Sequence, residues 1–216
     1  MSDRWNKYLE LMQERPELFS ESELIPIVTD YEIVNKYEKE TGKEIGVLYS
    51  SPYNMLVVDL IRGTEDKYYT YERLIPTVQS GAVVIMATCK EKAIVLCQYR
   101  HSTREFQYGF PRGFGEMGIS PEDNVKKEIK EEINAEVISC KYLGDLTPDS
   151  GVTANKVSYF WCEVDSYEEK LGYEGIDSVV ALEFEKLEEW IRNGTITDGY
   201  TVAAYGLYQM MKKHED

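Results

Sequence analysis

The spacing of hydrophobic and polar residues predicts that helices and strands are mixed along this chain. Residues 3–15 carry apolar side chains at the three-to-four-residue spacing of an amphipathic helix, which Pro16 ends. A second short helix is predicted at residues 31–41, and Gly42 stops it. Apolar and β-branched runs predict strands at 45–50, 54–63, 67–78, 81–89, 92–100, 105–110, 138–146, 156–164 and 178–187.

The remaining helices are predicted in the second half of the chain. They cover residues 121–134, 187–194 and 198–213, and the last has its apolar residues spaced to face a core. Those core-facing residues are Val202, Tyr205, Leu207, Tyr208 and Met211. This mixture predicts an α/β fold. A change from aromatic to apolar segments near residue 76 predicts an N-terminal extension at 1–74 and a main domain at 75–216.

Composition excludes several classes of protein. The 216 residues are 43% hydrophobic, which supports a buried core, and a net charge of -15 disfavours binding to nucleic-acid backbones. There is no apolar run of about 18 residues, so no membrane span is expected. The first residues lack the apolar centre of a signal peptide, which predicts a cytoplasmic location.

Cysteine and histidine usage limits the metal chemistry. The four cysteines lie in apolar surroundings without a C-x-x-C pair, so they are expected to be buried, reduced thiols. Two histidines are too few for a histidine-rich metal site. Any bound metal should therefore be held by oxygen, which suits Mg²⁺ or Mn²⁺.

One segment combines a glycine-rich loop with an acidic helix. Residues 109–134 read GFPRGFGEMGISPEDNVKKEIKEEIN, where Ser120 is a good N-cap and Pro121 suits the first helical position. At about 100° per residue, Val125, Ile129 and Ile133 form an apolar stripe, and Glu128, Glu131 and Glu132 share a separate arc.

The acidic arc has two interpretations. With Lys126, Lys127 and Lys130 it could be a solvated, charged face. The glycines before the helix favour the other interpretation, because they allow backbone oxygens to approach a ligand beside the carboxylates. Divalent cations there would offset the repulsion between an acidic protein and an anionic substrate.

The stretch from Gly113 to Ala135 resembles the Nudix box, G-x5-E-x7-R-E-U-x-E-E-x-G-U, in which U is aliphatic. QYR at 98–100, the following EFQYGFPRG and the tail IRNGTITDGYTVAAYGLY are similar to the ADP-ribose pyrophosphatase branch of that family. The resemblance covers roughly residues 75–212. It implies a Nudix-type α/β/α sandwich with a mixed β-sheet, preceded by an N-terminal α+β extension that contributes to a homodimer.

The resemblance also implies roles for particular residues. Glu128 and Glu132 would be the principal Mg²⁺ or Mn²⁺ ligands, with Glu131 and the backbone carbonyl of Arg112 as further ligands. Glu131 is also a candidate catalytic acid. Glu174, in a loop after the box, is the candidate general base, although it could equally be a solvated loop residue.

Two arginines are candidates for binding the substrate. Arg100 and Arg104 could bind its phosphates, although a surface ion pair explains Arg104 equally well.

Three positions depart from the box. Ile119 replaces a glutamate, Lys127 replaces an arginine, and Asn134 replaces a glycine. The first two normally pair, so losing both leaves no orphan charge but is expected to remove support from Glu128. Asn134 tolerates the left-handed conformation of a helix end.

The implied activity is metal-dependent hydrolysis of a nucleoside diphosphate derivative. ADP-ribose, giving AMP and ribose 5-phosphate, is the leading substrate, and a nucleotide sugar or NADH is an alternative. A second possibility is a degenerate Nudix domain that senses a nucleotide or serves in assembly, which the altered box positions favour slightly.

Overall fold

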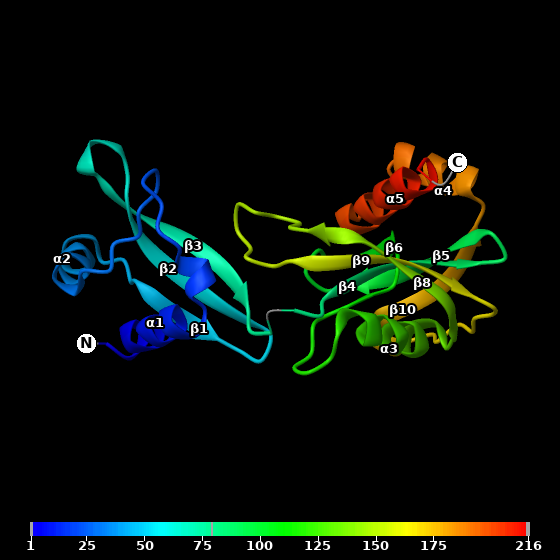
Figure 1. The fold of residues 1–216 in the computed structure, drawn as a ribbon, viewed down its shortest axis with the longest axis horizontal. Helices are drawn as coiled ribbons and strands as arrows, with labels where there is room; N and C mark the ends of the chain where they lie inside the picture. Colours follow the sequence, from blue (N-terminus) through cyan, green and yellow to red (C-terminus); the bar gives the residue numbers. More distant parts are fainter. Residues whose placement is uncertain (1, 79, 215–216) are drawn as a thin grey trace. The chain divides into compact units, whose positions relative to one another are not determined.

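The chain folds into two compact units in the computed structural model, which describes residues 2–78 and 80–214 (Figure 1). One unit comprises Met1–Val78 with Asp149–Asn155, and the other comprises Gln79–Pro148 with Lys156–Asp216. The segment Asp149–Asn155 thus belongs to the first unit, although its neighbours in sequence on both sides belong to the second. No sequence signal indicates this insertion.

The first unit is a small α+β structure. Its elements are α1 (Asp3–Glu14), η1 (Pro16–Phe19), α2 (Tyr31–Thr41), β1 (Gly46–Ser50), β2 (Asn54–Arg62), η2 (Thr64–Asp66) and β3 (Tyr68–Pro76). The three strands form an antiparallel sheet in the order β1-β2-β3. Both predicted helices are confirmed, and Gly42 ends α2 in the left-handed conformation with φ of 72°.

The core of this unit contains one buried acid with two partners. Asp59 on β2 is only 2% exposed; it accepts a hydrogen bond from the Tyr8 hydroxyl and lies 2.6 Å from Nε of Arg73. Removing Tyr8 or Arg73 would leave the buried carboxylate of Asp59 with too few hydrogen-bond and charge partners. Because Tyr8 lies on α1 and Asp59 on β2, their contact also holds α1 against the sheet. Trp5 and Leu11 pack beside it.

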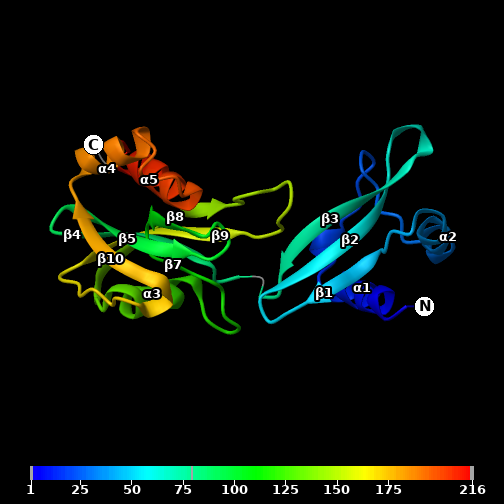
Figure 2. The ribbon, with the colours of Figure 1, turned by 180° about the vertical axis from the view of Figure 1, so that it is seen from behind.

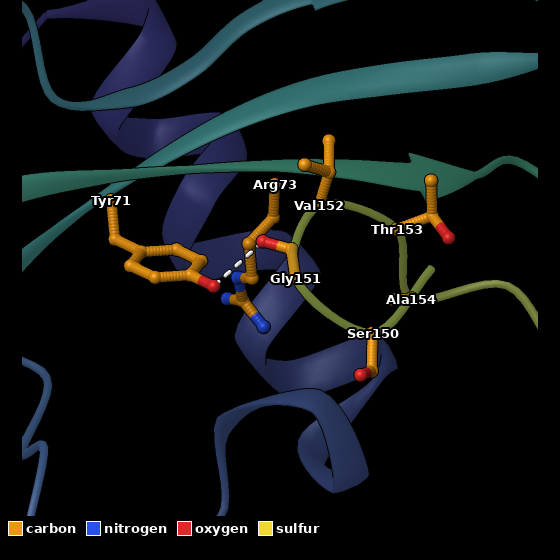
Figure 3. Close-up of a pocket in the computed structure, with 7 residues that line it drawn as sticks. All are labelled: Tyr71, Arg73, Ser150, Gly151, Val152, Thr153 and Ala154. Atoms are coloured by element: carbon orange, nitrogen blue, oxygen red, sulfur yellow. Dashed lines mark hydrogen bonds between the residues drawn. The ribbon is translucent and has the colours of Figure 1, made fainter. Parts of the chain in front are cut away.

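The inserted segment runs along β3. The Leu74 amide donates to the Val152 carbonyl at 2.8 Å, and the Ala154 amide donates to the Leu74 carbonyl at 3.1 Å. The Tyr71 hydroxyl donates to the Gly151 carbonyl at 2.7 Å, beside a small cavity of about 170 Å³ (Figure 3). None of the predicted site residues lines this cavity.

The second unit is a mixed sheet between helices. Its strands are β4 (Val83–Cys89), β5 (Lys92–Arg100), β6 (Glu105–Gly109), β7 (Arg112–Gly113), β8 (Val137–Leu146), β9 (Val157–Val164) and β10 (Ile176–Leu182). Its helices are α3 (Pro121–Ile133), η3 (Tyr173–Gly175), α4 (Phe184–Arg192) and α5 (Gly199–Lys212). The sheet order is β10-β5-β4-β9-β8, and β4 pairs parallel with β9 while the other pairs are antiparallel. Figures 1 and 2 show α3 on one face of this sheet and α4 with α5 on the other, which confirms the predicted α/β class with a mixed sheet.

The two faces of the sheet are packed by alternate residues of the same strands. On β4, Val83 and Ile85 belong to the core under α3, whereas Val84 and Met86 belong to the core under α4 and α5. A strand buried on both faces reads as an unbroken apolar run, as VVIMATC does.

The segment that leads into the acidic helix separates β4 from β5. These strands pair only next to their turn, through Thr88 with Ala93 and Cys89 with Lys92. Beyond that point β6 pairs with β5 and β7 pairs with β4. Residues 105–109 and 112–113 are therefore part of the sheet itself, and Gly113 is the last residue of β7, paired with Val83 of β4.

Two details differ from the sequence-based predictions. The strand predicted at 178–187 ends at Leu182, and α4 begins at Phe184, because apolar residues at short spacing fit either element. Val202, predicted to face the core, is 40% exposed, whereas Thr201 and Ala204 are buried. Within the described parts of the chain, every helix is too short or too polar to span a bilayer.

Candidate active site

The acidic helix α3 begins and ends as its sequence predicts. The Ser120 hydroxyl accepts from the Asp123 amide at 3.1 Å, and the helix ends at Asn134, which is left-handed with φ of 46°. Val125, Ile129 and Ile133 are fully buried against the sheet. This packing fixes the rotation of α3, and with it the direction in which the glutamates point.

Two of the three glutamates are buried. Glu128 is 8% exposed and Glu132 is 1% exposed, whereas the side chain of Glu131 is 36% exposed. Glu132 Oε2 accepts from the Arg112 amide at 3.1 Å. These positions exclude the interpretation of the whole arc as a solvated, charged face.

The glycine-rich loop makes room for these carboxylates. A Cβ on Gly113 would overlap the carboxylate of Glu128, so only glycine allows this approach. Asn124 holds the loop in place, since its side-chain amide donates to the carbonyls of Gly81 at 2.7 Å and Phe114 at 2.8 Å. Sequence reasoning did not identify Asn124, which lies on the acidic side of the helix, one turn before Glu128.

Burial makes both carboxylates reluctant to ionise. It raises the pKa of Glu128 to about 7, with Lys127 opposing the rise and Glu131 adding to it. Burial also raises the pKa of Glu132 to about 8, and the negative charge of Glu128 contributes. The two adjacent carboxyl groups offer oxygen donors of the kind that bind a hard divalent cation, and the charge of such a cation would favour their ionised forms.

The carboxylates do not form a complete metal-binding cluster in the structure. Among the described residues, no group of three or more His, Cys, Asp or Glu side chains is arranged to hold a metal ion. The third glutamate points to other partners: Glu131 Oε2 accepts from the Tyr173 hydroxyl at 3.1 Å and lies 3.2 Å from Nζ of Lys127. The donor chemistry of Glu128 and Glu132 fits Mg²⁺ or Mn²⁺, and recruiting Glu131 would require it to leave these partners.

Lys127 corrects one expectation drawn from the altered box. Its Nζ lies 2.6 Å from Glu116 Oε1 and 3.9 Å from Glu128 Oε1. The hydrogen bond to Glu116 is the largest cause that raises the pKa of Lys127. The ion pair that the changes at 119 and 127 were expected to remove is therefore present in another form, with Glu116 as the acid, and Glu128 keeps a neighbouring cation.

The two candidate substrate-binding arginines lie in different settings. Burial, and next the charge of Arg112, lower the pKa of Arg100, while Glu132 and Glu174 oppose the change. Its Nε is buried and has no hydrogen-bond partner among the described residues. Arg104 lies in the exposed turn after β5, with its Nη1 3.0 Å from His101 Nδ1. The structure thus groups Arg100, but not Arg104, with the glutamates.

Glu174 lies in the loop before β10. It adopts φ of 45° within η3, and its carbonyl accepts from the Gln98 side chain at 2.9 Å. Its negative charge contributes to the raised pKa of both Glu128 and Glu132. The loop therefore brings this acid into the electrostatic neighbourhood of the buried pair.

Asp198 is a site residue that sequence reasoning missed. This N-cap of α5 is 8% exposed, and its carboxylate accepts from Arg112 Nη1 at 3.0 Å and from the Thr201 amide and hydroxyl. The Thr201 hydroxyl in turn accepts from the Phe110 amide at 2.9 Å, and the Arg112 guanidinium lies over the ring of Tyr200. The first turn of α5 therefore anchors Phe110 and Arg112, and the Arg112 amide is the donor to Glu132. The D-G-Y-T spacing signals the cap but not this contact.

Comparison with known protein families gives a match. The model of the NUDIX domain family matches residues 77–203, more than half of the chain. The chain belongs to the Nudix family. Within that family its box carries isoleucine at 119, lysine at 127 and asparagine at 134.

A solved structure shares the fold. The crystal structure of an ADP compounds hydrolase is 16% identical and superposes with a TM-score of 0.64. The match covers 80% of this chain and 93% of that chain. A comparison with curated proteins found no match. The structural likeness confirms a Nudix-type fold.

Proposed function

We propose that this Nudix protein is a Mg²⁺- or Mn²⁺-dependent hydrolase that cleaves the diphosphate linkage of a nucleoside diphosphate derivative. The observation that carries the proposal is the buried pair Glu128 and Glu132, held on α3 against Gly113 and the Arg112 amide. Burying two carboxylates side by side is costly and gives the fold nothing in return. A cation-dependent reaction explains why they are there.

Each residue of the site has a role in this proposal. Glu128 and Glu132 would hold the metal, with Glu131 and the Arg112 carbonyl as further ligands. When bound, the metal supplies Lewis-acid activation of water and neutralises charge on the diphosphate. Glu174 would take the proton of the attacking water, a role that Glu131 could share, and Arg100 would bind a phosphate oxygen through its guanidinium.

ADP-ribose is the substrate that we propose, with AMP and ribose 5-phosphate as products. The sequence similarity to the ADP-ribose pyrophosphatase branch supports it, and the solved structure that shares the fold is an ADP compounds hydrolase. A nucleotide sugar or NADH has the same reactive linkage. The proposal also keeps a phosphate-binding role for Arg104, a homodimer and a cytoplasmic location as predictions.

A non-catalytic nucleotide sensor is the second candidate, and the replacement of the box glutamate by Ile119 favours it. Two observations favour the enzyme. Lys127, at one altered position, forms an ion pair with Glu116, and Asn134 takes the left-handed helix end that glycine would take. An ion pair of Lys127 and a left-handed helix end are therefore retained despite the altered box residues.

A substrate panel distinguishes the two candidates. The protein would be incubated with Mg²⁺ or Mn²⁺ and with ADP-ribose, ADP-glucose or NADH, and released nucleoside monophosphate would be measured. Glu132→Gln should abolish release, while Glu136→Gln, which changes an exposed glutamate paired with Lys130, should not. Ligand binding without turnover of any compound would support the sensor and refute the hydrolase.

A further inference from the structure

Two cysteines face each other across neighbouring strands, away from the glutamates. Cys140 on β8 lies directly opposite Cys162 on β9 in the antiparallel ladder. The Cys162 thiol donates to the Cys140 sulfur, and the two Sγ atoms are 2.9 Å apart. Opposed residues in such a ladder have Cα atoms about 4.5–5.5 Å apart, within the range of about 4.4–6.8 Å that disulfides span. A bond between these sulfurs therefore requires no movement of the strands.

The two thiols differ in accessibility and in proton affinity. Cys140 is exposed, which corrects the expectation that all four cysteines are buried, whereas Cys162 is fully buried. The hydrogen bond from Cys162 lowers the pKa of Cys140, and Lys126 of α3 acts in the same direction against burial and Glu122. The pKa of Cys162 is raised, first by that hydrogen bond and then by burial. Cys140 is thus the accessible nucleophile and Cys162 its adjacent partner.

The other two cysteines have different partners. The Cys89 thiol donates to the Asp165 carbonyl at 3.4 Å, and Cys97 interacts with the Tyr108 hydroxyl. Both are buried. They serve as internal controls, since they share the chain and the solvent but lack a facing thiol.

We propose that Cys140 and Cys162 form a reversible intramolecular disulfide when the protein meets a hydroperoxide. The Cys140 thiolate attacks one peroxide oxygen, the O–O bond breaks, and hydroxide leaves as Cys140 becomes a sulfenic acid. The Cys162 sulfur then attacks the Cys140 sulfur, the S–O bond breaks, and water leaves after taking up the Cys162 proton. Two thiols and one hydrogen peroxide thereby give one disulfide and two waters, and a dithiol reverses the reaction.

The position of the pair sets its consequence. Cys162 belongs to the same apolar cluster as Val125, Ile129 and Ile133, the buried stripe of α3. The bond would tie β8 to β9 beneath that helix and close the chain between residues 140 and 162. Closing such a loop constrains the unfolded chain, so the oxidised protein should melt higher by about 5 °C.

Mass spectrometry of the intact chain tests the proposal. Reduced protein would be treated with hydrogen peroxide, then alkylated under denaturing conditions. We expect a loss of about 2 Da, two alkylated thiols in place of four, and a cross-linked peptide joining Cys140 to Cys162. Dithiothreitol should restore four thiols.

Variants make the assignment specific. Cys140→Ser and Cys162→Ala should each abolish the intramolecular bond, and Cys89→Ala should form it as the wild type does. Because Cys162 is buried and its variant can misfold, the exposed Cys140 carries the decisive comparison. Four alkylated thiols after peroxide, oxidation of Cys140 only to sulfinic acid, or a disulfide that persists in Cys140→Ser would overturn the proposal.

Discussion

Replacing Glu132 by glutamine should stabilise the protein at neutral and alkaline pH, although it removes a site residue. Glu132 is 1% exposed, and burial together with the charge of Glu128 raises its pKa to about 8. A glutamine oxygen can still accept from the Arg112 amide, which is 3.1 Å away from the carboxylate oxygen. The substitution therefore removes a buried charge and keeps its hydrogen bond.

The size of the effect follows from the two pKa values. An unfolded glutamate has a pKa of about 4.3, whereas that of folded Glu132 is about 8. Between these values the native protein holds a proton that the unfolded chain has released, so wild-type stability falls as pH rises. The slope is about 1.4 kcal/mol per pH unit, which accumulates to about 5 kcal/mol at pH 8. The variant lacks this titration, so its advantage should grow with that slope between pH 5.5 and 8.

Urea unfolding in EDTA, followed by tryptophan fluorescence across this pH range, measures the difference. Glu131→Gln is the matched control, since its side chain is 36% exposed, and should change stability by less than about 0.5 kcal/mol. Adding Mg²⁺ should stabilise the wild type more than Glu132→Gln. A stability difference that does not change with pH, or a variant less stable than wild type at pH 8, would show that Glu132 does not carry a costly buried charge.

Three further substitutions test other parts of the site. Gly113→Ala should lower kcat by about 100-fold, because the new methyl group would overlap the Glu128 side chain from its carboxylate to its Cγ and displace it; unchanged kcat refutes this. Lys127→Met should lower kcat/KM about tenfold, because it removes the cation beside the carboxylates of Glu128 and Glu131. Lys127→Arg keeps that cation and should keep the wild-type kcat/KM. Equal kcat/KM in the two variants would contradict this role. Asp198→Ala should lower the free energy of unfolding by about 2–4 kcal/mol, because it removes the cap of α5 and the partner of Arg112; a loss under about 0.5 kcal/mol in urea denaturation would exclude that anchor.

The parts of the site that lie on one helix could be predicted from the sequence. The Ser120 cap, the apolar stripe of α3 and the common direction of Glu128 and Glu132 each depend on residues that repeat at steps of three or four positions. Helical geometry places such residues without reference to the rest of the chain. The same holds for the left-handed end at Asn134.

Contacts between distant residues could not be predicted in this way. The anchor of Arg112 on Asp198 joins residues 86 positions apart, and the pairing of Lys127 with Glu116 depends on the path of a glycine-rich loop. Hydrophobic spacing likewise does not show that β6 and β7 separate β4 from β5, or that Asp149–Asn155 joins the first unit.

The sequence by itself determined the acidic helix, its cap and the family to which the chain belongs, because these depend on local spacing. Only the tertiary structure decided which carboxylates are buried, which cation supports them and which two cysteines meet. Burial and pairing are set by elements that pack together from different parts of the chain, and periodicity within one segment carries no information about its neighbours in space.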